Sequence, residues 1–297
     1  MSAGPAAAAA PDLRQVPFDT DPGRYRHWRL ATEGPVATLT LDVAEDGGVA
    51  PGYQLKMNSY DLGVYLELYD AVQRLRFEHP EIRAVIVTSG KERTFCAGAN
   101  IGMLASASHG WKVNFCKLSN ETLAAIVDAT ACSGQTYIAA LNGTAAGGGY
   151  ELALACDQVV LVDDGSSVVA LPEVPMLGVL PGTGGLTRLT DKRGVRRDRA
   201  DVFATTAEGV RGDRAVAWRL VDATVRARDF PAEIGARAQA AAGRSARHAP
   251  DGQPGVELTR LRRDTGADGC RIRYDHLLAE IDRRRSEEHT SELQSPC

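Results

Sequence analysis

The chain has 297 residues, of which 44% are hydrophobic and 24% are charged, and its formal net charge is −4. Such a chain can bury a sizeable core in one large or two small domains, and its composition is that of a soluble globular protein. The small negative charge gives no reason to expect nucleic acid as a partner, and no apolar run approaches the length of a membrane span. We therefore expect a cytoplasmic protein with neither a nucleic-acid nor a membrane partner.

The two ends of the chain differ from the rest. Residues 1–21 are alanine-rich and then irregular, with no basic start or strongly apolar stretch, so we expect a disordered leader and not a signal peptide. Residues 285–297 resemble the translation of a common sequencing adaptor, and we leave them out of the fold prediction. We accordingly expect a truncated chain whose natural protein continues further.

The first half of the chain alternates strand and helix patterns. Residues 36–41 alternate polar and apolar side chains, which predicts a half-buried strand. Residues 61–79 have apolar side chains at helical spacing, and Pro80 ends this helix. Residues 84–88 form a nearly continuous apolar run, which is typical of a strand buried on both faces.

The alternation continues through the middle of the chain. Residues 117–131 predict a helix, with Ser119 or Asn120 as its N-cap and Glu121 in its first turn. Further segments of this region are predicted as strands at 137–141 and 159–162 and as a helix at 151–155. Alternating strands and helices predict an α/β protein with right-handed crossovers.

The character changes from about Asp191, where helical segments replace strands. Residues 211–220 and 231–242 are predicted helices, and the polar stretch 244–268 is expected to be loosely ordered. We therefore divide the chain into a catalytic core at 22–225 and a helical or irregular region at 226–284, which would begin a missing second half.

The six cysteines are widely scattered, at Cys96, Cys116, Cys132, Cys156, Cys270 and Cys297. None forms a C-x-x-C pair or stands at metal-site spacing from histidines, so we expect reduced thiols and no metal. Cys96 lies within a loop of functional interest. A catalytic thiol there is a second interpretation, although no nearby histidine would activate it.

A glycine run stands between a predicted strand and a predicted helix. Gly147-Gly148-Gly149 follows the strand at 137–141 and precedes Glu151. Unpaired N–H groups at the start of a helix favour negative charge, so this is a suitable place for a developing oxyanion. Taken alone, the run is explained equally well by a tight strand–helix turn.

A second loop of small residues, Phe95-Cys96-Ala97-Gly98-Ala99-Asn100, also follows a buried strand. It could expose another backbone N–H, and Ala97 is our first choice. Two such donors from separate loops would clamp one carbonyl oxygen. Alone, this loop is more simply an ordinary turn.

Two carboxylates complete the pattern. Glu151 lies in the first turn of the helix after the glycines, and Glu173 follows Pro172 in an apolar setting just before the segment Pro181-Gly182-Thr183-Gly184-Gly185. Each alone is explained by a capping or loop charge. Two carboxylates facing one water can divide acid and base roles when burial separates their pKa values.

Together these segments resemble the crotonase (enoyl-CoA hydratase/isomerase) superfamily over roughly residues 34–225. The resemblance implies an α/β fold in which a crotonase-like spiral of ββα units is followed by a helical C-terminal region used in assembly, so we expect a homo-oligomer. It implies an acyl-CoA substrate and no cofactor beyond the CoA of the substrate. By motif it assigns the oxyanion hole to the N–H groups of Ala97 and Gly148 and the acid–base roles to Glu151 and Glu173, without saying which is acid and which is base.

The resemblance also suggests substrate contacts and a branch. Lys56 falls near a basic residue that meets the CoA phosphates, and Ala99 and Asn100 are expected to contact the substrate or its CoA part. A long segment at 46–59 and the bulky Tyr150 depart from ordinary hydratases. These departures resemble a longer branch that opens the ring of 2,3-epoxybenzoyl-CoA in aerobic benzoate degradation and releases formate.

Two other functions stay open at this point. An ordinary enoyl-CoA hydratase/isomerase would share the site and differ in the shape of its pocket. A non-catalytic CoA-binding or assembly protein could use the same scaffold, although the presence of both glutamates argues against it. A truncated chain could also be inactive or unfolded.

Overall fold

The computed structural model describes residues 16–247, 254–267 and 269–282. Its internal contacts divide the chain into one unit that ends at Glu257 and a second that begins at Leu258. The expected adaptor segment and the first 15 residues of the expected leader lie outside the described residues. Val16, which lies within that expected leader of residues 1–21, packs against the main core.

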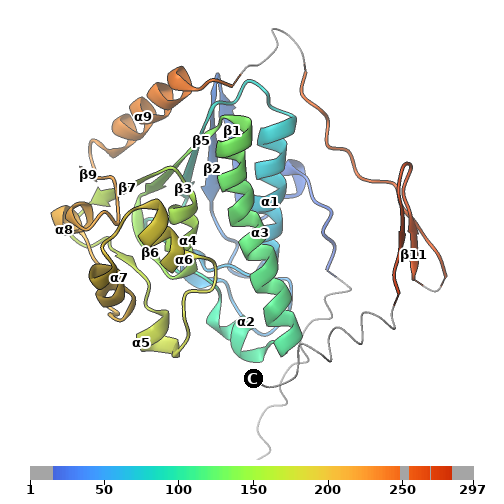
Figure 1. Ribbon diagram of the computed structural model, residues 1–297, viewed down its shortest axis with the longest axis horizontal. Coiled ribbons are helices and arrows are strands. Elements are labelled where there is room, and N and C mark those ends of the chain that lie inside the picture. The colour runs from blue at the N-terminus through green and yellow to red at the C-terminus, as the bar shows by residue number, and fades with distance from the viewer. Residues whose placement is uncertain (1–15, 248–253, 268, 283–297) are drawn as a thin grey trace, which may run out of the picture. The chain divides into compact units, whose positions relative to one another are not determined.

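The first unit is built on a six-stranded sheet in the order β1-β2-β3-β5-β7-β9 (Figure 1). Its strands are β1 (Trp28–Glu33), β2 (Val36–Leu41), β3 (Ala84–Ser89), β5 (Thr136–Leu141), β7 (Gln158–Asp163) and β9 (Ala223–Arg226). The β1–β2 pair is antiparallel and the other pairs are parallel. The expected buried strands therefore form the centre of this sheet.

A second, three-stranded parallel sheet contains β4 (Arg93–Cys96), β6 (Gly143–Ala146) and β8 (Val169–Ala170). Each of these strands follows a strand of the large sheet and precedes a helix. The chain thus repeats a ββα unit, which confirms the expected spiral. The repetition matters for function because the ends of β4, β6 and β8 bring three distant segments to one place.

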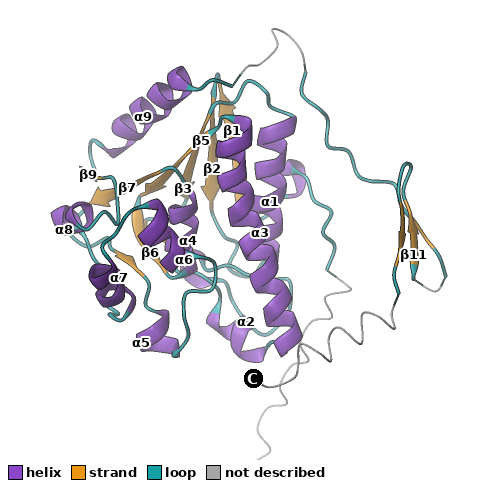
Figure 2. Cartoon of the chain, viewed as in Figure 1, coloured by secondary structure: helices purple, strands orange, loops and turns teal. Residues whose placement is uncertain are grey.

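Helices cover both faces of the large sheet (Figure 2). Those that precede the last strand of the large sheet are η2 (Pro22–Arg24), η3 (Lys56–Asn58), α1 (Leu62–Phe77), α2 (Ile101–Ser106), α3 (His109–Ser133), α4 (Gly148–Ala155), α5 (Glu173–Leu177), α6 (Gly185–Thr187), η4 (Arg188–Lys192), α7 (Arg197–Ala204) and α8 (Gly212–Ala217). Helices α1, α3 and α4 share the main core with one face, and α9 (Phe230–Arg244) packs on the other. Side chains of β3 alternate between the two cores, since Val85 belongs to the main core and Ala84 to the α9 cluster.

The beginning of helix α3 differs from the prediction. The helix begins at His109, where the Ser108 hydroxyl oxygen accepts a hydrogen bond from the Trp111 N–H. The expected caps, Ser119 and Asn120, lie inside the helix, and their side chains donate to carbonyl groups four residues earlier. Polar residues that bond back to the preceding turn can occupy a helix interior, and this local pairing made them resemble caps.

Two further predictions for the second half are wrong. Strands do not end before Asp191, since β9 pairs with β7 at the edge of the large sheet. The described part of the polar stretch up to Glu257 is firmly attached. The Arg247 guanidinium donates to the carbonyl groups of Pro80, Ser133 and Arg76, and the Val256 N–H donates to the carbonyl of Phe77. The expected helix at 231–242 is confirmed as α9.

The second unit contains a small antiparallel sheet of β10 (Asp264–Thr265), β11 (Arg271–Arg273) and β12 (Leu278–Glu280). Most of its side chains are exposed, and an Arg271–Glu280 ion pair crosses two of its strands. Such a sheet buries little apolar area by itself.

Candidate active site

The glycine run lies where β6 meets α4. Gly147 has φ of +53°, which favours glycine, and its N–H donates to the Ala170 carbonyl of β8. The N–H groups of Gly148 and Gly149 donate to no acceptor in the part of the chain that the structure describes. The start of α4 therefore presents two unengaged N–H groups, as expected for an oxyanion site.

The loop 97–99 lies directly against this helix start. A Cβ added to Gly98 would lie 2.9 Å from the Gly148 nitrogen and 3.0 Å from the Ala146 carbonyl oxygen. Only glycine permits this close approach, and Gly98 also has φ of +90°. Two segments about 50 residues apart in the sequence thus meet at the N-terminus of α4.

The structure corrects the choice of Ala97. Its N–H donates to the Met57 carbonyl at 3.2 Å and is therefore not free to bind a ligand. Tyr60 pairs with the loop on both sides of Ala99, through the Gly98 carbonyl and the Asn100 N–H. In a parallel pairing of this kind the intervening N–H points away from the partner strand. Among the described residues the Ala99 N–H has no acceptor, so Ala99 is the better candidate donor.

Glu151 is held in place by the segment 181–185. Its Oε1 accepts hydrogen bonds from the N–H groups of Thr183 (2.9 Å) and Gly185 (2.8 Å), and its Oε2 accepts from the Thr183 hydroxyl (2.6 Å). The side chain is buried within the first turn of α4. Three donors define the orientation of this carboxylate, which explains why the Pro-Gly-Thr-Gly-Gly segment accompanies it.

Glu173 begins helix α5 and lies beside the glycine run. A Cβ added to Gly147 would lie 3.0 Å from the Glu173 Oε1, and the Glu173 Oε2 is buried without a hydrogen-bond partner. Burial, with a contribution from the charge of Glu151, raises the pKa of Glu173 from 4.5 to about 7. The two glutamates therefore share one site and differ in environment, as acid–base partners must.

An open groove of about 730 Å³ leads to the loop 97–99. It is lined by Gly52, Tyr53, Gln54, Lys56, Ser59, Ala97, Ala99, Asn100, Ile101 and Gly102. The Lys56 side chain is exposed, and no ion-pair partner for it is found within the described ranges. The groove thus brings the three expected contacts, Lys56, Ala99 and Asn100, to one surface.

The Asn100 side chain is largely committed to the fold. Its Oδ1 caps α2 by accepting from the Met103 N–H at 2.9 Å, and its Nδ2 donates to the Gln54 carbonyl and the Ser59 hydroxyl. Asn100 therefore shapes the groove, and no polar atom of its side chain is left without a partner. This role was not assigned from the sequence, although asparagine before an apolar helix is a common N-cap pattern.

The cysteines divide into different environments. Cys96 is fully buried, its thiol donates to the Asn58 carbonyl, and burial raises its pKa to about 12, which argues against a catalytic thiolate.

Cys116 was not singled out from the sequence. It is partly buried on α3, and burial together with the charge of Glu151 raises the pKa of its thiol. No sequence signal linked it to Glu151, because the packing of α3 against α4 brings the two residues together.

Residues 54–250 match the enoyl-CoA hydratase/isomerase family. The chain belongs to this family. It is 60% identical over 277 residues to the benzoyl-CoA-dihydrodiol lyase of Aromatoleum evansii, a match that covers 93% of this chain and 49% of that protein. The chain therefore spans about half the length of this curated relative.

Solved structures of the same family are also similar. An enoyl-CoA hydratase from Geobacillus kaustophilus HTA426 superposes with a TM-score of 0.64 at 35% identity, over 74% of this chain and 75% of that one. An enoyl-CoA hydratase from Bacillus anthracis gives a TM-score of 0.62 at 26% identity, over 73% and 76% of the two chains. The enoyl-CoA hydratase/isomerase fold of this chain is thus shown by sequence and by structure.

Metal ligands and membrane-spanning helices are two further features to consider in this chain. Within the described ranges, no three His, Cys, Asp or Glu side chains lie together as metal ligands would. In the same residues, no helix combines the length and the apolar character needed to cross a bilayer.

Tyr150 and Trp111 are two large aromatic residues near the site, and both pack in the core. The Tyr150 hydroxyl donates to the Leu220 carbonyl at 2.7 Å, and its ring meets Phe203 edge-on, so Tyr150 packs in the core and ties α4 to the end of α8. Trp111 is buried on α3 and stacks on Phe115 with ring centroids 5.5 Å apart.

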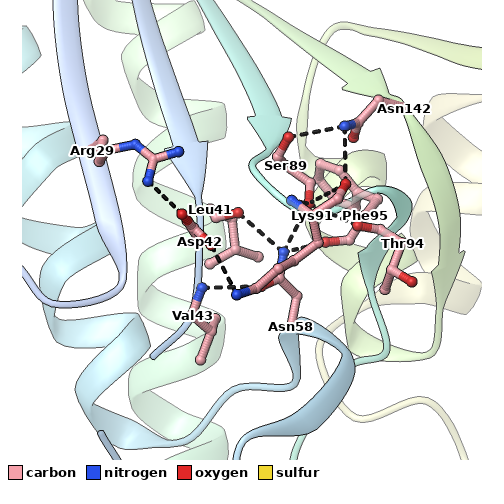
Figure 3. Close-up of polar contacts among 10 residues, drawn as sticks. All are labelled: Arg29, Leu41, Asp42, Val43, Asn58, Ser89, Lys91, Thr94, Phe95 and Asn142. Atoms are coloured by element: carbon pink, nitrogen blue, oxygen red, sulfur yellow. Dashed lines mark hydrogen bonds and ion pairs between the residues drawn. The ribbon is translucent and has the colours of Figure 1, made fainter. Parts of the chain in front are cut away.

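Asn58 connects the turn before α1 with the ends of three strands (Figure 3). Its Oδ1 accepts from the Val43 N–H, and its Nδ2 donates to the Leu41 carbonyl, the Ser89 hydroxyl and the Phe95 carbonyl, all within 2.8–3.1 Å. The side chain is fully buried and every polar atom is paired. Asn58 therefore holds β2, β3 and β4 in register at the site.

The same turn positions the loop 97–99. The Met57 carbonyl accepts from Ala97, and the Asn58 carbonyl accepts from the Cys96 thiol. Both turn residues have positive φ, +57° and +52°, which asparagine tolerates better than most residues. The Asn58 side chain and its backbone thus act together on the candidate oxyanion loop.

We expect Asn58→Ala to lower the free energy of unfolding by about 3–5 kcal/mol, since it leaves buried N–H and C=O groups unpaired at a left-handed position. Urea denaturation of the unaltered chain and of the Asn58→Ala variant measures this difference in the free energy of unfolding. The matched control is Asn114→Ala, because Asn114 is exposed on α3 and bonds only to the Gly110 carbonyl of its own helix. It should change stability by less than about 0.5 kcal/mol. Equal effects of the two substitutions would refute the role of Asn58.

Proposed function

We propose that this chain carries the catalytic site of a CoA-thioester lyase that opens the ring of 2,3-epoxybenzoyl-CoA and releases one carbon as formate. The observation that supports it is the convergence of unengaged N–H groups, at Ala99 and Gly148, with the carboxyl groups of Glu151 and Glu173. The 60% identity to a benzoyl-CoA-dihydrodiol lyase favours an aromatic acyl group and a place in aerobic benzoate degradation.

In this proposal the N–H groups of Ala99 and Gly148 bind the thioester oxygen as enolate character develops on it. Such preorganised donors act at the start of α4, where the helix dipole adds to their effect. Loss of one oxyanion donor typically costs about 2.7–4 kcal/mol of transition-state stabilisation. The two N–H groups thus polarise the thioester so that the ring conjugated to it accepts the attack by water.

The two glutamates then divide the proton transfers. Glu173, with its pKa near 7, can hold or release a proton at neutral pH, and its unpaired Oε2 is available to a substrate or water. Glu151, fixed by three hydrogen bonds, orients water from the other side. Two water molecules are consumed overall: their addition opens the epoxidised ring, and cleavage of one carbon–carbon bond releases formate and leaves an unsaturated C6 semialdehyde CoA thioester. No cofactor is required beyond the CoA of the substrate.

The groove beside Lys56 would hold the CoA part of this substrate. The exposed positive ammonium group of Lys56 is complementary to the negative phosphates of CoA, and the groove includes Ala99, whose N–H would bind the thioester oxygen.

We also propose that copies of this chain associate with one another. Four exposed apolar side chains follow one another along α5 and the next loop, at Met176, Leu177, Val179 and Leu180.

An ordinary enoyl-CoA hydratase is the second candidate, because both glutamates are present and the similar solved structures are named as hydratases. Incubation of the chain with crotonyl-CoA and with 2,3-epoxybenzoyl-CoA, with detection of hydrated product and of formate, separates the two. We expect formate from the epoxidised thioester, and none from a chain that carries both Glu151→Gln and Glu173→Gln. Fast hydration of crotonyl-CoA without any formate would favour the hydratase instead.

A further inference from the structure

Tyr60 touches both candidate oxyanion donors. Its backbone pairs with the loop on either side of Ala99, through Gly98 and Asn100. Its side chain reaches α4, since a Cβ added to Gly148 would lie only 1.8 Å from the Tyr60 hydroxyl oxygen. The phenol oxygen is therefore in contact with the α-carbon of the residue whose N–H faces the acyl oxygen.

Neighbouring rings hold the phenol in one orientation. The Tyr60 ring centroid lies 4.4 Å from that of Tyr65 and 6.0 Å from that of Phe115, and Phe115 stacks on Trp111. All four side chains are buried. A buried ring that packs against Tyr65 and Phe115 has little freedom to turn without disturbing the core.

The hydroxyl groups of Tyr60 and Tyr65 carry two hydrogens, but only one of them can be used in a hydrogen bond between the two groups. Neither hydroxyl donates to a carbonyl or a carboxylate of the described residues, and the two hydroxyls interact with each other. Even when one hydroxyl donates to the other, the pair retains one O–H that nothing accepts. Burial, with the adjacent Tyr65 and the charge of Glu151, raises the pKa of Tyr60 well above its ordinary value, so the proton is kept at neutral pH. An unused donor of this kind beside a site invites a ligand oxygen.

Resting on the proposed function, we infer that the Tyr60 hydroxyl is a further substrate contact. It donates a hydrogen bond to an oxygen on the aromatic ring of the substrate, at the ring carbon next to the one that bears the thioester. The acyl oxygen on the Gly148 N–H and a ring oxygen at the adjacent carbon are only a few bonds apart in the substrate. Because the Tyr60 hydroxyl contacts Gly148, it lies close enough to donate to the ring oxygen while the Gly148 N–H binds the acyl oxygen. Tyr60 thereby favours oxygenated aromatic thioesters over unsubstituted ones.

The test compares two inert thioesters on the same proteins. Isothermal titration of this chain with 2-hydroxybenzoyl-CoA and with benzoyl-CoA gives a ratio of dissociation constants that reports the ring oxygen alone. We expect the chain to prefer the hydroxylated thioester by about 5- to 10-fold, and the Tyr60→Phe variant to bring the ratio close to 1. A general loss of fold would weaken both ligands together and leave this ratio unchanged.

The matched control is Tyr137→Phe. Tyr137 is another fully buried tyrosine whose hydroxyl has no hydrogen-bond partner among the described residues, but it lies in β5, where its charged neighbours include Arg76 and Arg247. It should keep the preference of the unaltered chain. If the unaltered chain and the Tyr60→Phe variant give the same ratio of dissociation constants, the role of Tyr60 is refuted and the proposed function is unaffected. Failure of the unaltered chain to bind either thioester overturns both.

Discussion

Replacement of Glu173 by glutamine should lower kcat by about 10²- to 10⁴-fold on whichever CoA thioester the chain turns over. Glutamine keeps the shape of the side chain and removes its proton exchange, so the loss measures acid–base chemistry. Steady-state kinetics of the two proteins provide the comparison. We choose Glu121→Gln as the control, since Glu121 is exposed on α3 and pairs only with Lys117 one turn earlier. It should leave kcat unchanged.

The same pair of variants gives a pH signature. Because burial raises the pKa of Glu173 to about 7 from 4.5, the folded chain binds more protons than the unfolded chain between these values. This contribution to stability is complete below pH 4.5 and is lost as the pH rises through 7. Thermal melts should therefore show a fall in Tm from pH 5 to pH 8 that is smaller in Glu173→Gln. A rate profile should lose its inflection near pH 7 in that variant alone, and an unchanged profile would contradict the assignment.

The second large effect concerns the contact between α4 and β4. A Cβ added to Gly149 would lie 2.3 Å from the Cys96 carbonyl oxygen and 2.7 Å from the Cys96 Cβ, so the Gly149→Ala variant must move backbone. We expect it to lower the free energy of unfolding by about 3 kcal/mol or more, and the Tm by roughly 6–12 °C. Activity should fall with it, because the oxyanion loop follows Cys96 directly.

Gly110→Ala serves as the reference for that measurement. Gly110 lies in α3, is exposed, and has no atom within 4 Å of an added Cβ. Its replacement should leave stability unchanged or raise it by up to about 1 kcal/mol, because alanine has the higher helix propensity. Calorimetry of both variants that gave similar Tm values would show that the close approach at Gly149 is not required.

Sequence patterns predicted the parts of this fold that depend on local periodicity. The buried strands at 84–88, 137–141 and 159–162 and the helix at 61–79 all carry their signal within a few residues, and each occurs within about two residues of its expected bounds. The start of α3 was missed because Ser119 and Asn120 bond backward within a helix as readily as they cap one. The edge strand β9 has only four residues, which is too short for a clear periodic signal, so its pairing with β7 defines it.

The site shows the same division. The glycine run, both glutamates and the loop 95–100 were recognisable as motifs because their residue types are needed by the chemistry itself. The sequence did not show which N–H group of that loop is free, because this depends on hydrogen bonds to Met57 and Tyr60, which lie about 40 residues earlier. The roles of Asn58, Tyr60 and Cys116 likewise arise from contacts between distant segments.

The amino-acid sequence by itself thus indicated the family, the central buried strands with the helix at 61–79, and the two carboxylates, because these depend on periodicity and on short motifs. Tertiary structure decided that Ala99 and not Ala97 offers its N–H, that Glu173 has a pKa near neutrality, and that a tyrosine lies against Gly148. The physical reason is that hydrogen-bond pairing and desolvation depend on which atoms surround a group, and these atoms come from segments far apart along the chain.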